Sequence, residues 1–173
     1  MAHDRAQERV LALDVRSRKV GFVVFEGPDN LLDWGVKSYA PQYGPLEVTV
    51  SKKIGNVLKL VLPSAIVLRI PSERLVRKNG RIKVVVNTLR KEVRRRSVSL
   101  RFLGRQRVKK FFMGRGVTTK HGIASLLAER FPDLAWKLPP KRKPWQSEAY
   151  SMTIFDAAAA GVAHFGLPVA NKG

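Results

Sequence analysis

Two acidic residues lie inside apolar segments that are far apart in the sequence. Asp14 interrupts the apolar run LALDV, and Asp156 lies within the run IFDAAAA. A carboxylate among apolar residues costs free energy unless it is paired with a cation or binds a metal ion. Carboxylate oxygens are hard ligands that suit Mg²⁺ or Mn²⁺, ions that activate water in phosphodiester hydrolysis. The alternatives are an ion pair of Asp14 with Arg16 or Arg18, and a solvent-facing helix position for Asp156.

Other groups with catalytic or metal-binding chemistry are few. The sequence has no cysteine, which excludes disulfides, thiolate metal sites and a cysteine nucleophile. Its three histidines, His3, His121 and His164, are too scattered to indicate a zinc site. The sequence also lacks the Gly-rich phosphate-binding loop of NTPases and the HExxH and GxSxG motifs. A divalent metal ion held by the two acids against a phosphate is therefore the chemistry that the residues favour.

The chain is strongly basic, with 33 Lys and Arg against 13 Asp and Glu in 173 residues and a net charge of +20. Between residues 69 and 115 there are 17 basic residues and two acidic ones. A solvated helix face explains most charge runs, but this run crosses several elements and indicates a nucleic-acid partner. The residues expected to bind the phosphates are Arg69, Arg94, Arg95, Arg96, Arg105, Arg107, Lys109, Lys110, Arg115 and Lys120. Phe111 and Phe112 could stack on bases, although at least one of them is expected to fill the core at a strand end.

The elements that must position these residues follow from apolar periodicity. Strands are expected at 10–15, 19–25, 31–39, 65–70 and 98–103, the first three forming an antiparallel meander. Helices are expected at 46–62, 82–93, 119–130 and 147–165, with a Pro- and Lys-rich linker at 138–144. This order predicts an α/β fold with one mixed five-stranded sheet flanked by helices. The length predicts a single domain over 1–173 with its core at about 10–165.

The order of these motifs resembles the RuvC family of bacterial Holliday-junction resolvases, which have an RNase H-like fold. Residues 13–22 (LDVRSRKVGF) are similar to the family's first hairpin, D-x-G-S-x-x-x-G-aromatic, and residues 32–36 resemble its third strand. Residues 108–120 reproduce the family spacing V-K-x4-G-x-G-x3-K, and residues 156–164 match its final D-A-x6-H. The resemblance implies that Asp14 and Asp156 are the first and last metal-binding acids. It also implies that Lys109 and Lys120 approach the DNA backbone and the active centre.

The chain departs from the family pattern at four positions of the implied site. Arg16 stands where the family has Gly, and Arg69 where it has its second catalytic Glu. Thr153 replaces the third metal ligand, and Ser72 replaces an aromatic residue that stacks on bases. A guanidinium at position 69 could pair with either aspartate and occupy the oxygen atoms that a metal ion needs.

Two glutamates are the possible substitutes for the missing acids. Glu73 lies four residues beyond Arg69, and a turn at Ile70-Pro71 could bring it back toward the site. Glu148 would lie about 12 Å before Asp156 if both belonged to one continuous helix.

The resemblance and the charge together predict metal-dependent cleavage of branched DNA, four-way junctions above all, in recombination and repair. Asp14, Asp156 and Glu148 would hold Mg²⁺ or Mn²⁺, Glu73 is the other candidate acid, and Lys120 would stabilise phosphate charge. The alternatives are a catalytically inactive DNA-structure-binding protein with the same fold, or a basic RNA-binding protein.

The resemblance also implies a homodimer. The apolar stripe at 82–93 could form its interface, although packing on its own sheet is the commoner use of such a stripe. The expected location is cytoplasmic and nucleoid-associated, without a membrane partner. This rests on an N-terminal segment that lacks an apolar signal region and on the absence of any apolar run long enough to span a bilayer.

Overall fold

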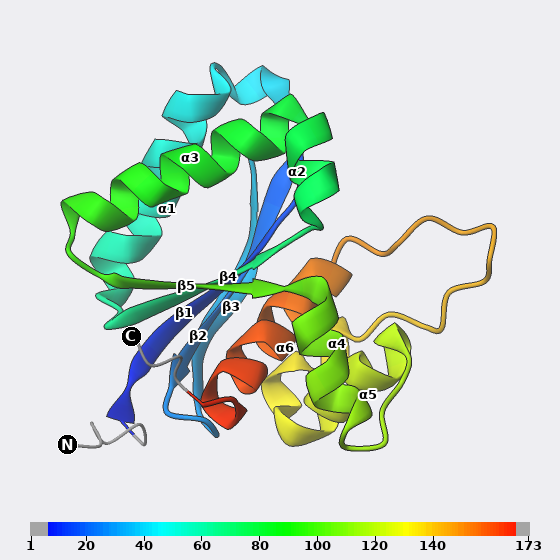
Figure 1. Cartoon of the computed structure of the whole chain (residues 1–173). Coiled ribbons are helices and arrows are strands. Elements are labelled where there is room, and N and C mark those ends of the chain that lie inside the picture. Colours follow the sequence, from blue (N-terminus) through cyan, green and yellow to red (C-terminus); the bar gives the residue numbers. More distant parts are fainter. Residues whose placement is uncertain (1–6, 169–173) are drawn as a thin grey trace.

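A mixed five-stranded sheet forms the centre of the computed structural model, which describes residues 7–168 (Figure 1). The strands are β1 (Arg9–Val15), β2 (Lys19–Glu26), β3 (Leu31–Ser38), β4 (Ala65–Ile70) and β5 (Ser99–Gly104). Their order across the sheet is β3-β2-β1-β4-β5. The first three strands pair antiparallel, whereas β4 is parallel to both β1 and β5. The predicted α/β fold with an antiparallel opening is therefore confirmed. The expected cellular location was based on the N-terminal segment, and most of that segment lies outside the described residues.

Helices cover both faces of the sheet (Figure 1). One face carries α1 (Leu46–Val61), α2 (Glu73–Lys78) and α3 (Gly80–Arg95), and the other carries α4 (Arg105–Met113), α5 (Lys120–Arg130) and α6 (Met152–Gly166). Two 3-10 helices, η2 (Pro41–Tyr43) and η3 (Pro132–Lys137), lie in the connections. Within residues 7–168 no helix is both long enough and apolar enough to cross a bilayer.

The alternation of side chains along β1 decides which face receives Asp14. Leu11 and Leu13 point into the core beneath α1 and α3, whereas Val10 and Ala12 point into the core that contains α6. Because successive strand residues point to opposite faces of the sheet, Asp14 points to the same face as Val10 and Ala12. The acid therefore points toward α6, the helix that carries Asp156.

The close packing of α6 on the sheet depends on a glycine in β2. Gly21 is paired with Asp14 in the strand register. A Cβ atom on Gly21 would lie 2.3 Å from the carbonyl oxygen of Thr153, a separation that side chains do not adopt. The first turn of α6 can therefore approach β2 directly beside Asp14.

The last helix is shorter than its apolar pattern predicted. The expected helix over 147–165 begins only at Met152, and residues 138–151 form an irregular connection. Glu148 and Tyr150 contact other elements of the fold, and these contacts compete with the helical conformation of the segment.

Two short helices were not predicted. Helix α2 begins at Glu73 and is capped by Ser72, whose hydroxyl accepts from the backbone N–H of Leu75. Helix α4 contains Phe111 and Phe112, and both are buried. The expectation that these phenylalanines lie at a strand end was wrong, because they fill the core from a helix.

The apolar stripe of α3 is used within the chain. Its members are buried in the core shared with α1 and the sheet, namely Ile82, Val85, Val86, Leu89 and Val93. The stripe is therefore not free to form an interface between two copies of the chain.

Candidate functional site

The register of two neighbouring strands places Asp14 beside Arg69. β1 and β4 are parallel, and the two residues are direct partners across them. Their side chains share one face, and Arg69 Nη1 donates to Asp14 Oδ1 at 2.5 Å. Arg69 Nη2 lies 3.6 Å from Asp156 Oδ1. A buried guanidinium thus stands between the two aspartates, at the position where the resemblance implied a carboxylate.

A second arginine bridges three carboxylates. Arg16 lies in the turn between β1 and β2. Its Nε donates to Asp14 Oδ2 at 2.7 Å, and its Nη2 donates to Asp156 Oδ2 at 2.5 Å and to Glu148 Oε1 at 3.1 Å. The sequence indicated Arg16 as an alternative partner of Asp14 and as a departure from the Gly of the family pattern. Its contacts with the other two acids were not foreseeable, because they join segments more than a hundred residues apart.

The turn that carries Arg16 is held by two residues without a predicted role. Tyr39 is buried, and its hydroxyl contacts the carbonyl oxygens of Arg16 and Lys19. Arg81 of α3 donates to the carbonyl oxygens of Ser17 and Tyr39 at 3.0 and 3.1 Å. These bonds fix the backbone of the turn and thereby orient the Arg16 side chain.

Lys120 and Glu148 complete the cluster. Lys120 Nζ lies 2.6 Å from Glu148 Oε2 and 2.8 Å from Asp156 Oδ2. Glu148 reaches the cluster from the irregular connection rather than from α6, so the separation expected along a continuous helix does not apply. Glu73, in contrast, is exposed in the first turn of α2 and forms no ion pair with any other described residue. The structure therefore brings Asp14, Asp156, Glu148 and Lys120 together and leaves Glu73 outside.

The pKa values of Asp156 and Glu148 are shifted by burial and by the neighbouring cations. Burial raises the pKa of Asp156 above its ordinary value, against the charge of Arg69. Burial acts in the same direction on the pKa of Glu148, but the hydrogen bond and charge of Lys120 and the charge of Arg16 outweigh it and lower that pKa. Burial lowers the pKa of Arg16, but the neighbouring acids, Asp14 foremost, leave it raised. Arg16 therefore carries its charge at every ordinary pH.

As arranged, these residues do not fit a divalent cation. Every carboxylate oxygen of the three acids faces a nitrogen of Arg16, Arg69 or Lys120, and the Thr153 hydroxyl also donates to Asp14 Oδ2. The three negative charges are thus matched by three fixed positive charges, which would repel a metal ion at contact distance. Among residues 7–168 no group of three acidic or histidine side chains is arranged to hold a metal.

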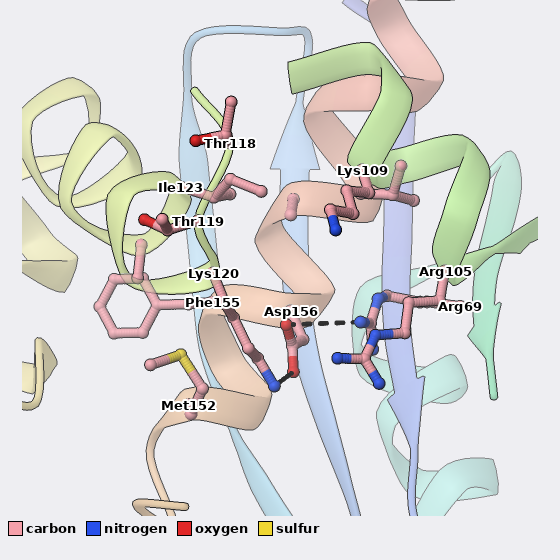
Figure 2. A pocket seen from close by; sticks show the side chains of 13 residues that line it. Arg69, Arg105, Lys109, Thr118, Thr119, Lys120, Ile123, Met152, Phe155 and Asp156 are labelled. Carbon is pink, nitrogen blue, oxygen red and sulfur yellow. Dashed lines mark ion pairs between the residues drawn. The ribbon is translucent and has the colours of Figure 1, made fainter. Parts of the chain in front are cut away.

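A pocket of about 300 Å³ lies beside this cluster (Figure 2). Its charged lining comes from four elements and consists of Arg69, Arg105, Lys109, Lys120 and Asp156. Figure 2 shows Asp156 between Lys120 and Arg69, both of which it pairs with. Thr118, Thr119 and the first turn of α5 form another part of the wall.

The chemistry of the pocket suits an anion. Four cations and one acid line the pocket, which leaves it positive. The N-terminal end of the α5 dipole adds to this positive potential. The Nε of Arg69 is buried and has no hydrogen-bond partner within the described residues. A buried donor without a partner is unfavourable, and a phosphate oxygen is an acceptor that would satisfy it.

The predicted basic residues separate into two groups. Arg69, Arg105, Lys109 and Lys120 line the pocket, and Arg107, Lys110 and Arg115 are exposed on or just after α4. Arg94, Arg95 and Arg96 lie at the end of α3, where β5 begins, whereas α4 follows the other end of β5 (Figure 1). The length of β5 alone separates the two groups by about 17 Å. Arg95 and Arg96 also pair with Glu92, so the run of charge in the sequence is not one continuous surface.

Solved structures of RuvC and of a mitochondrial Holliday junction resolvase have a similar fold. The chain is similar to Thermus thermophilus RuvC in complex with a Holliday junction substrate, at 18% identity over 91% of this chain and 92% of that chain, with a TM-score of 0.66. A second Thermus thermophilus RuvC structure matches at 19% identity over 90% and 92%, with a TM-score of 0.64. The yeast mitochondrial Holliday junction resolvase matches at 12% identity over 92% and 79%, with a TM-score of 0.59. No protein-family model and no curated protein sequence matches the chain. The structural likeness establishes the RNase H-like fold that the sequence predicted.

Proposed function

We propose that the chain binds branched DNA, four-way junctions foremost, by holding backbone phosphates in the cationic pocket beside Asp156. The observation that carries this proposal is the convergence of Arg69, Arg105, Lys109 and Lys120 on one pocket from three helices or strands. Phosphate contacts of this kind supply most of the affinity of nucleic-acid-binding proteins.

The preference for branched DNA is supported by the fold. One structure that shares it is a complex of RuvC with a Holliday junction substrate. The pocket lies beside the paired acids Asp14 and Asp156, which the resemblance to the same family places at its active centre. A strand that enters the pocket would therefore pass next to this centre.

In this proposal the arginines take the electrostatic place of a metal ion. Arg69 and Arg16 neutralise Asp14 and Asp156, so a phosphate can approach without meeting uncompensated carboxylates. Guanidinium groups also bind phosphate oxygens directly, often with two parallel hydrogen bonds. They supply no activated water, and the function that the site supports best is therefore binding without cleavage.

Metal-dependent cleavage of the same DNA is the second candidate. It is favoured by the convergence of three acids, since Asp14, Asp156 and Glu148 all contact the single side chain of Arg16. For these acids to bind Mg²⁺ or Mn²⁺, Arg16 and Arg69 would have to leave the positions that they occupy.

One experiment distinguishes the two candidates. A labelled four-way junction is incubated with the wild-type chain in Mg²⁺, and then in Mn²⁺, and the products are resolved on native and denaturing gels. We expect a retarded complex with intact strands. If the wild-type chain produces nicked strands, and the variants Asp14→Asn and Asp156→Asn do not, cleavage is established instead. The lack of a complex, or equal retention of an RNA duplex, would overturn the proposal of branched-DNA binding.

A further inference from the structure

The connection between η3 and α6 carries exposed aromatic rings next to the site. Residues 138–151 stand out from the body of the molecule as an extended loop (Figure 1, orange). Trp145 is 78% exposed and Tyr150 is 55% exposed, and both belong to this loop. Long loops without helices or strands in compact domains usually have a binding role.

The tip of the loop is an ordered turn. The backbone N–H of Gln146 donates to the carbonyl oxygen of Lys143 at 3.0 Å, and the N–H of Lys143 donates to Gln146 Oε1 at 2.9 Å. Arg142 Nη1 donates to the carbonyl oxygen of Gln146 at 3.1 Å. Pro144 occupies the second position of the turn, where its fixed φ is favourable. The Trp145 ring is therefore presented from a defined backbone and costs little ordering entropy on binding.

The base of the loop is joined to the carboxylate–arginine cluster. Glu148 accepts from Arg16 through one carboxylate oxygen and from Lys120 through the other. The Lys19 ammonium lies 4.1 Å from the centroid of the Tyr150 ring. Glu148 is the third residue after Trp145, so their Cα atoms are at most about 11 Å apart. A strand whose phosphate lies at Lys120 is therefore within reach of the exposed ring.

We infer that Trp145 stacks on an unstacked base of a bound DNA strand and that Glu148 positions its loop. This inference rests on the proposed binding of branched DNA. Bases inside a duplex are covered on both faces, whereas bases at a branch point can expose a face to an aromatic ring. Lys141, Arg142 and Lys143 are exposed and closely precede Trp145 in the loop, and Lys143 Nζ lies 5.5 Å from the ring centroid.

The other exposed tryptophan provides a contrast. Trp136 is 70% exposed, but its ring contacts Trp34 edge to face at 5.6 Å. The Lys137 ammonium also lies 4.0 Å from the centroid of Trp136. No protein ring contacts Trp145 within the part of the chain that the structure describes, so the face away from Lys143 remains available to a base.

Tryptophan fluorescence tests the inference directly. The substitutions Trp34→Phe and Trp136→Phe leave Trp145 as the only tryptophan of the chain. The anisotropy of a labelled four-way junction reports binding, and the emission of Trp145 reports stacking in the same titration. We expect strong quenching of Trp145 by the junction and little quenching by a saturating amount of fully paired duplex.

Variants separate stacking from charge. In the wild-type background Trp145→Ala should weaken junction binding about tenfold, and Trp145→Phe should restore most of the loss. Glu148→Gln should reduce the quenching of Trp145 in the junction complex, because it removes the carboxylate charge that Arg16 and Lys120 hold and thereby loosens the loop. A structural role of Glu148 that is unrelated to the loop would leave the quenching unchanged.

The possible failures are distinguishable. A junction that binds while Trp145 emission stays constant would overturn the stacking inference and leave the proposed function in place. Equal weakening of junction and duplex binding by Trp145→Ala would also overturn it, because a paired duplex offers no free base. Absence of junction binding by the wild-type chain would overturn the proposed function and the inference together.

Discussion

Arg69 and Asp14 face each other across adjacent parallel strands, and their side chains form a buried ion pair 2.5 Å long. The strand register fixes this pairing, since neighbouring residues of parallel strands project to the same side. Asp156 lies on the other side of the same guanidinium, 3.6 Å from its Nη2. A permanent cation thus occupies the space between the two acids that the sequence singled out as metal ligands.

The first prediction concerns this cation. Arg69→Glu replaces a positive charge by a negative one beside Asp14 and Asp156. A unit charge at about 4 Å contributes on the order of 4 kcal/mol near a protein surface. We therefore expect Mn²⁺ affinity, measured by calorimetric titration, to rise at least about tenfold relative to the wild-type chain. Arg94→Glu is the matched control, because it makes the same charge change on an exposed residue at the end of α3. If the wild-type chain binds Mn²⁺ tightly, and Arg69→Glu leaves that affinity unchanged or weakens it, then arginine does not block the site.

The second prediction separates the two groups of basic residues. Arg105 lines the pocket and Arg94 does not, although both are exposed and neither forms an ion pair within residues 7–168. Arg105→Ala should weaken junction binding and reduce the slope of log K against log salt by about one, as expected for one lost phosphate contact. Arg94→Ala should have a smaller effect on both quantities. A larger effect of Arg94→Ala would place the main DNA contact at the end of α3 rather than at the pocket.

The third prediction concerns stability. Asp14→Asn removes the charge of the nearer of the two carboxylates that pair with buried Arg69, and loss of one member of a buried ion pair costs about 3 kcal/mol. We expect that decrease in the free energy of unfolding in urea, together with unchanged or tighter junction binding, because a negative charge near the phosphates is removed. Unchanged stability would mean that the Arg69–Asp14 pair is not formed in solution.

The fourth prediction concerns acid stability at a distance from the site. Glu92 is buried between α1 and α3 and accepts from Ser51 and Arg96. Burial raises its pKa, but these two hydrogen bonds and the neighbouring arginines bring the pKa below its ordinary value of 4.5. Since the pKa is lower in the folded than in the unfolded chain, the stabilisation is complete above about pH 4.5 and is lost as the pH falls through the folded value.

Glu92→Gln tests this assignment. At neutral pH the substitution should lower the free energy of unfolding by about 2 kcal/mol, as expected for lost hydrogen bonds to charged groups. The difference between variant and wild type should narrow as the pH falls below 4.5, measured by urea denaturation. A difference that stays constant from pH 7 to pH 3 would show that the carboxylate charge is not the stabilising feature.

The sequence predicted the elements whose signal is local. The strands that carry Asp14 and Arg69 have continuous apolar patterns, and the five strands lie where these patterns placed them. The apolar run around Asp14 also predicted that this acid would be buried, whereas for Asp156 a solvent-facing helix position was left open. Both acids are buried. Local periodicity contains these features because burial of one face requires them.

The sequence indicated that Arg69 could pair with Asp14 or Asp156, and it contacts both. The other contacts of the site were not predictable, because they depend on distant segments. Arg16 reaches Glu148 and Asp156 across more than a hundred residues, and no local pattern records such a pairing. The same contacts hold Glu148 in a loop, although the apolar pattern predicted a helix over 147–165. The pocket and the position of Trp145 likewise became visible only when α4, α5, α6 and the loop were packed together.

The arginine-filled site should bind branched DNA without a metal ion. The anisotropy of a labelled four-way junction, titrated with the wild-type chain in EDTA at physiological ionic strength, measures this. An equal-length duplex serves as the reference. In EDTA we expect the junction to bind at least about tenfold more tightly than the duplex, a difference of about 1.4 kcal/mol. Junction binding that appears only after Mg²⁺ or Mn²⁺ is added, or equal affinity for junction and duplex, would contradict this expectation.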